Sequence, residues 1–216
     1  MEVVHGFCGY DTRSFSQAAR GLARLMPRYP MRSAWRNFRS GSAPVAAPSV
    51  ARMSPRGQAR ILGLDPGSLR TGFGVIDYAG GTLTIVAQGC IVTHGGPLAD
   101  RLRLIHARVA ELIVQYCPQE VAVERVFLSK NADSALKLGQ ARGAALAAVP
   151  ATLGVHEYAP RAVKLAVVGV GGAEKAQVAH MVKQLLRVEL KLAADAADAL
   201  AIAICHANSR KFEMIA

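Results

Sequence analysis

Short runs in which apolar and polar residues alternate begin just after residue 60, and they predict β-strands. Residues 61–65 are apolar until the run ends in a carboxylate and a Pro-Gly turn. Residues 71–77 and 82–93 follow with period-two alternation. Because the links between these runs are short, we expect three strands in an antiparallel meander.

A helical period follows the meander. Between Pro97 and Cys117 apolar residues recur at helical spacing, and Pro118 ends the pattern. Residues 120–126 then predict a fourth strand. A strand–helix–strand passage normally makes its two strands parallel neighbours by a right-handed crossover, so we expect this strand beside residues 61–65.

The remaining pattern predicts further helices and one short strand. The expected elements are a helix from Asn131 to about Ala148 capped by Asn131 or Asp133, a strand at 155–158, and helices at 160–168, 174–188 and 194–208. Gly139, Gly143 and many alanines give the first of these helices a smooth face. That face suits either packing on the sheet or a subunit interface.

Carboxylates occur where such a fold would bring them together. Asp65 ends the first strand, and Glu124 lies near the end of the fourth. Open α/β sheets bind their ligands at the carboxyl ends of parallel strands. Asp195 and Asp198 begin an otherwise apolar helix and share one of its faces. Each acid alone has a simpler explanation, either as a turn aspartate or as an acid that interacts with the helix dipole. These explanations account less well for four such acids in one fold.

Converging carboxylates have a definite chemistry. They raise one another's pKa, and a divalent cation removes that cost. Oxygen ligands suit Mg²⁺ or Mn²⁺ rather than Zn²⁺. Two such ions can activate a water and stabilise the leaving oxygen of a phosphodiester. Three antiparallel strands, a helix, a parallel strand and a carboxylate on the first strand describe a ribonuclease-H-like nuclease of the α/β class.

The net charge of +11 is concentrated at the N-terminus. Residues 1–60 contain ten arginines, no lysine and two acids, a net charge of +8, so residues 61–216 contribute only +3. The first segment is rich in Ser, Ala, Pro and Gly and has no sustained period. We therefore predict a disordered extension at 1–59, followed by a nuclease domain at 60–210.

Three interpretations of the extension stay open. The first is an arginine-rich arm that contacts phosphates. The second is an organelle presequence, and the third is translated sequence upstream of a start at Met53. No apolar run reaches the length of a membrane helix. The scattered cysteines favour reduced thiols in a cytosolic protein.

From about Arg60 to His206 the chain resembles the RuvC family of Holliday-junction resolvases. The stretches that carry the resemblance occur in the family's order and spacing: ILGLDPGS at 61–68, VERVF at 123–127, KNADSALKLGQARG at 130–143, AEK at 173–175 and ADAADALA at 194–201. The resemblance implies a ribonuclease-H-like fold with a mixed five-stranded sheet flanked by helices. The N-terminal extension is a departure from the family pattern.

The resemblance also implies roles for individual residues. The catalytic metal ligands would be Asp65, Glu124, Asp195 and Asp198, which would bind two Mg²⁺ ions per subunit, with Mn²⁺ as a substitute. Some members of the family have a histidine where this chain has Asp195.

The implied DNA contacts and partners follow from the same resemblance. Phe127 would stack on bases near the crossover, and Lys164 and Lys175 would lie near the scissile phosphate. The enzyme would be a homodimer that nicks two symmetric strands of a four-way DNA junction in recombination and repair, with helix 131–148 at the dimer contact. RuvA and RuvB would be its branch-migration partners in the bacterial cytoplasm.

Other classes differ in features visible in the sequence. An actin-like or sugar-kinase-like ATPase would need two such domains, and only one Asp-Pro-Gly turn occurs here. A junction-binding module without activity would not need the four carboxylates. The closest alternative among enzymes is a ribonuclease-H-fold protein that acts on RNA.

Overall fold

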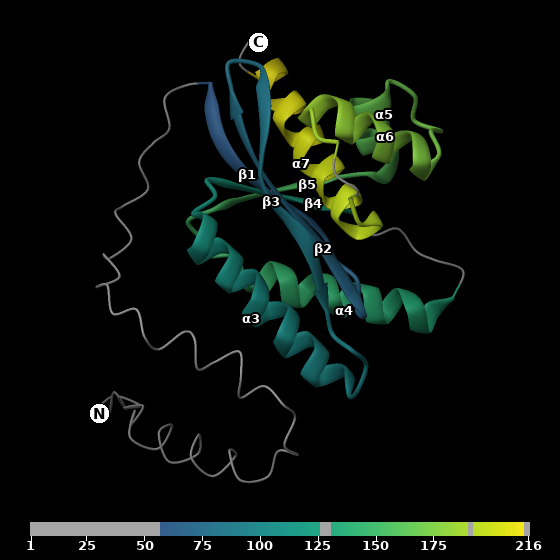
Figure 1. Cartoon of the computed structure of the whole chain (residues 1–216). Helices are drawn as coiled ribbons and strands as arrows, with labels where there is room; N and C mark the ends of the chain where they lie inside the picture. The colour runs from purple at the N-terminus through teal and green to yellow at the C-terminus, as the bar shows by residue number, and fades with distance from the viewer. Residues whose placement is uncertain (1–56, 126–130, 190–191, 214–216) are drawn as a thin grey trace, which may run out of the picture. The chain divides into compact units, whose positions relative to one another are not determined.

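A computed structural model describes residues 57–125, 131–189 and 192–213 of the chain (Figure 1). The strands are β1 (Gln58–Asp65), β2 (Arg70–Ala79), β3 (Thr82–Val92), β4 (Glu120–Glu124) and β5 (Gly154–Tyr158). The helices are α3 (Leu98–Tyr116), α4 (Ala132–Ala147), α5 (Pro160–Val168), α6 (Lys175–Leu186) and α7 (Ala194–Glu213).

The five strands form one mixed sheet in the order β3-β2-β1-β4-β5. β1, β2 and β3 are antiparallel neighbours, whereas β4 is parallel to both β1 and β5. The predicted meander and the predicted parallel pairing of the first and fourth strands are therefore confirmed, as is the fold class.

Successive side chains of β1 point to opposite faces of the sheet and so pack in two different cores. Ile61 packs with apolar residues of α5, α6 and α7, whereas Leu62 and Leu64 pack with those of α3 and α4. Because successive strand side chains point to opposite faces, Asp65 lies on the same face as Ile61. The sheet is thus covered by α5, α6 and α7 on one face and by α3 and α4 on the other (Figure 1).

Helix α7 contacts the backbone of the sheet directly, and glycines make this possible. A Cβ atom added at Gly63 would lie 2.2 Å from the carbonyl oxygen of Ala199, and one at Gly72 would lie 2.0 Å from that of Asp195. Both distances are far shorter than real contacts, so only glycine permits this approach. The contact fixes the first turns of α7 against β1 and β2.

Several boundaries differ from the sequence prediction. The predicted strand at 120–126 ends at Glu124, because Arg125 is exposed and outside the ladder, while Val126 lies outside the described residues. The second strand was predicted at 71–77, but β2 continues to Ala79, and its Tyr78 pairs with Ala59.

The helix ends show similar differences. Asn131 caps α4, as one of the two predicted options, and its side chain accepts a hydrogen bond from the Ser134 N–H. The last helix continues past Asn208 to Glu213. Among the described residues, no helix is long and apolar enough to cross a bilayer.

Replacing Gly63 tests the contact between α7 and the sheet. Gly63→Ala should lower the free energy of unfolding by about 1–3 kcal/mol, because the added methyl group must displace α7. Urea denaturation followed by circular dichroism measures the change.

The matched control is Gly172→Ala in the exposed turn before α6, where an added Cβ meets no atom within 4 Å. This change should be neutral or should stabilise by up to about 1 kcal/mol, because alanine has less freedom than glycine in the unfolded chain. Equal effects of the two substitutions would contradict the close approach.

Candidate active site

The carboxylates of Asp65 and Glu124 meet at the carboxyl ends of adjacent parallel strands. The register of β1 and β4 pairs Leu64 with Val123, so the next residue of each strand is one of these acids. Ala122 packs in the core on the α7 side, so by alternation Glu124 faces the same side as Asp65. The strand pairing therefore aims both carboxylates toward the first turns of α7.

Helix α7 supplies the other two acids. Asp195 and Asp198 occupy its first turns, and their side chains are 28% and 29% exposed. The close contact at Gly72 involves the Asp195 carbonyl itself. The same packing that holds α7 against the sheet thus brings its acidic residues toward Asp65.

The acids repel one another. Burial, and next the charges of Asp198 and Asp195, raise the pKa of Asp65 to about 6. Burial, and next the charges of Asp65 and Asp198, raise the pKa of Glu124 to about 7. The ionised forms of Asp65 and Glu124 are therefore costly in the folded protein unless positive charge offsets them.

Lysines beside this group supply part of that positive charge. Lys175, at the start of α6, places its Nζ 3.0 Å from Asp198 Oδ2 and lowers the pKa of Asp65 and Glu124. Lys164 on α5 also lowers the pKa of Glu124. Both predicted basic residues therefore lie near the acidic group, whereas Phe127 lies outside the described residues.

Asp195 differs from Asp65 and Glu124 because an arginine pairs with it directly. Arg70 Nε lies 2.6 Å from Asp195 Oδ2. Burial opposes the shift, but hydrogen bonds from Arg70 and Cys90 hold the pKa of Asp195 below its usual value. This pairing could not be predicted from the sequence, because the two residues are 125 positions apart.

The acidic group suits a divalent metal ion by its chemistry. Its donors are all carboxylate oxygens, which are the ligands that Mg²⁺ and Mn²⁺ prefer. The raised pKa values of Asp65 and Glu124, caused first by burial and next by neighbouring carboxylates, show that nearby positive charge does not fully offset their ionised forms. An ion with two charges would supply it, so the residues fit the metal predicted from the sequence.

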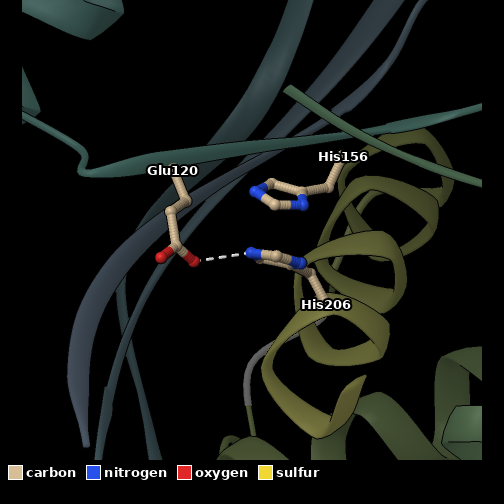
Figure 2. A group of neighbouring side chains, drawn as sticks. All are labelled: Glu120, His156 and His206. Atoms are coloured by element: carbon tan, nitrogen blue, oxygen red, sulfur yellow. Dashed lines mark hydrogen bonds and ion pairs between the residues drawn. The ribbon is translucent and has the colours of Figure 1, made fainter. Parts of the chain in front are cut away.

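A different group of side chains has its ligand atoms closest together. Among the described residues, Glu120, His156 and His206 are the group whose potential metal-ligating atoms all lie within 4.8 Å of one another (Figure 2). Sequence reasoning missed this group, because its members are scattered and have no ligand-like spacing. The available signal was Glu120, a charged residue that opens a buried strand.

The sheet order, the flanking helices and the acids at the strand ends define the chain as a ribonuclease-H-like α/β protein. The sequence model of the family described as crossover junction endodeoxyribonuclease RuvC matches residues 61–206. The chain therefore belongs to the RuvC family.

Individual relatives agree with this assignment. The RuvC protein of Vibrio campbellii is 57% identical over 152 residues, which cover 70% of this chain and 88% of the relative. The Thermus thermophilus RuvC structure aligns with a TM-score of 0.66 at 35% identity, covering 71% of this chain and 96% of that one. The structure of Thermus thermophilus RuvC in complex with a Holliday junction substrate also aligns with a TM-score of 0.66 at 35% identity, covering 72% of this chain and 96% of that one.

The raised pKa of Glu124 predicts that this residue destabilises the fold above neutral pH. Below its ordinary pKa of 4.5 the carboxyl is protonated in both the folded and unfolded states and contributes nothing. As the pH rises from 4.5 to about 7, the unfolded state ionises first, so stability is lost. Glu124→Gln should therefore raise the free energy of unfolding by ~1–3 kcal/mol at about pH 8, with no change at about pH 4.

Urea titrations without metal, at a series of pH values, measure this difference. Glu111→Gln on the exposed face of α3 is the control and should follow the wild-type profile. A Glu124→Gln effect of the same size at every pH would show that ionisation of Glu124 does not destabilise the fold.

Proposed function

We propose that the chain is a divalent-metal-dependent endodeoxyribonuclease that resolves four-way DNA junctions by paired nicks. The observation that carries the proposal is the meeting of Asp65, Glu124 and Asp198 beside Lys175 at the carboxyl ends of β1 and β4. Membership of a family of crossover junction endodeoxyribonucleases gives the substrate class. A Holliday junction substrate is bound by the related Thermus protein.

The proposed metal ligands are Asp65, Glu124, Asp195 and Asp198, for two Mg²⁺ ions per subunit with Mn²⁺ as a substitute. Bound ions of this kind stabilise the charge that develops on phosphate oxygens and lower the pKa of water. Arg70 holds the carboxylate of Asp195 in one orientation through the 2.6 Å contact. Catalytic roles for these residues rest on the electrostatics of the site and on the family.

Positive charge from the chain itself would orient the DNA. The Lys175 side chain is 82% exposed, so it can exchange its contact with Asp198 for one with a phosphate oxygen. Lys164 lies close enough to Glu124 to lower its pKa, and it would add a second phosphate contact. Phe127, which follows β4, is proposed to stack on unpaired bases near the crossover.

Assembly is also part of the proposal. Two symmetric nicks need two active sites, and we assign the dimer contact to α4. Leu136 is 67% exposed there, and an added Cβ at Gly139 or Gly143 would meet nothing within 4 Å, so the face is open to a second copy. RuvA and RuvB are the proposed partners, and the bacterial cytoplasm, at the nucleoid, is the proposed place of action.

Asp65→Asn separates binding from chemistry. It removes a proposed metal ligand but no positive charge, so affinity for a four-way junction should be retained or slightly increased. Loss of a residue that only hydrogen-bonds to a metal ligand already lowers activity by ~10–100-fold. Because Asp65 is itself a proposed ligand, cleavage should fall at least ~100-fold. Gel-shift and nicking assays on one junction measure both quantities.

Asp100→Asn, on the exposed surface of α3, is the matched control and should keep full activity. If Asp65→Asn lost binding and cleavage equally, Asp65 would act in holding the DNA, and the proposed division of labour would be wrong.

Removing residues 1–52 tests the domain assignment. We propose that residues 60–210 form the nuclease domain and that the arginine-rich extension is not needed for chemistry. The shortened chain should resolve junctions at the wild-type rate when assayed at low salt. Loss of resolution would show that the extension is a functional DNA-binding arm.

A further inference from the structure

A second polar cluster lies at the opposite end of β4 from the proposed active site. Glu120 opens β4, and alternation places it on the same face as Glu124, four residues and about 13 Å away. His156 comes from the middle of β5, and His206 comes from the C-terminal half of α7. Of these three elements, β4 and α7 also carry acids of the proposed active site.

The geometry of the cluster is tight. His206 is only 2% exposed, and its Nε2 lies 2.6 Å from Glu120 Oε2. The ring of His156 stacks over that of His206 with centroids 4.1 Å apart. Each ring turns one nitrogen toward the side on which the Glu120 carboxylate lies (Figure 2).

The donor set matches a different class of ion from that of the acidic site. Two imidazole nitrogens and one carboxylate oxygen are ligands for zinc-class ions, whereas Mg²⁺ prefers oxygen alone. With bonds of about 2.0–2.1 Å in tetrahedral geometry, ligand atoms stand about 3.3 Å apart. The present 2.6 Å between His206 Nε2 and Glu120 Oε2 therefore needs to widen by less than ~1 Å for an ion to replace the shared proton.

Neighbouring groups hold two of the three residues in position for a metal ion. Tyr158 lies with its hydroxyl 2.7 Å from His206 Nδ1, so it orients the ring and leaves Nε2 directed at Glu120. The Glu120 side chain is held in place in turn, because its Oε2 contacts both His206 Nε2 and Arg210 Nε.

Arg210 sets a limit on the affinity. Its Nε lies 3.3 Å from Glu120 Oε2, the oxygen that also contacts His206. A cation here repels an incoming ion and contacts the same oxygen that would bind it, so it lowers the affinity of the site.

We propose that Glu120, His156 and His206 form a second metal site, for a zinc-class divalent ion, separate from the acidic residues at the other end of β4. Three protein ligands leave a coordination position for water. An ion bound there would join β4, β5 and α7 and so stabilise the framework that carries Glu124, Asp195 and Asp198. Its effect is on stability, whereas the acidic site supports cleavage.

Zn²⁺ binding to the full-length protein tests the proposal. Isothermal titration calorimetry, together with the visible absorption of the Co²⁺ complex, should show one site in the wild type that Mg²⁺ does not displace. His156→Phe keeps a ring on His206 but removes the ligand, and should weaken that site more than ~10-fold. Zn²⁺ should raise the melting temperature of the wild type but not of this variant.

Two control variants locate the site. His180→Ala removes an exposed histidine of α6, and Asp65→Asn removes a ligand of the acidic site; both should retain the Zn²⁺ site. No Zn²⁺ binding in the wild type, unchanged binding in His156→Phe, or loss of binding in Asp65→Asn would overturn the proposal. In those cases the three side chains serve only to connect α7 to the sheet through hydrogen bonds.

X-ray absorption of the Zn²⁺-loaded wild type gives an answer that does not depend on any variant folding. Two imidazole ligands in the first shell support the site, and a shell made only of oxygen overturns it.

Discussion

The direct contact between α7 and the sheet determines where every functional side chain lies. Gly63 and Gly72 have no side chains, so the helix backbone rests on β1 and β2. Since α7 is one rigid helix, the same contact positions Asp195 and Asp198 at one end and His206 near the other. The alternation of side chains along β1 and β4 then directs Asp65, Glu120 and Glu124 toward α7.

The acidic site is assembled at a cost to stability. Asp65 and Glu124 have raised pKa values because they are buried together with Asp198, and Lys175 compensates only in part. A carboxylate group that is costly without metal binds a divalent cation more strongly, since binding removes the repulsion. The same feature that weakens the metal-free fold therefore favours the proposed chemistry. Asp195 is relieved separately, by Arg70.

Much of this arrangement could be predicted from the sequence. Period-two alternation and short links predicted the meander, and the helix between the first and fourth strands predicted their parallel pairing. From that pairing, Asp65 and Glu124 could be placed side by side. The i and i+3 spacing placed Asp195 and Asp198 on one face of α7.

Other features depended on contacts between distant residues, which no local pattern encodes. The pairing of Arg70 with Asp195 spans 125 positions. Glu120, His156 and His206 come from three elements and meet only because β4 and β5 are in register and α7 crosses them. The predicted strand at 120–126 was also too long, because the alternation of residue types continues past Glu124, where the register with β5 stops.

Cleavage of a mobile four-way DNA junction, with Mg²⁺ and with EDTA, beside linear duplex and an RNA–DNA hybrid, tests the proposed resolvase activity most directly. Paired, symmetric nicks should appear on the junction alone and only when metal is present. Cleavage of the hybrid instead, or binding of the junction without nicks, would contradict it.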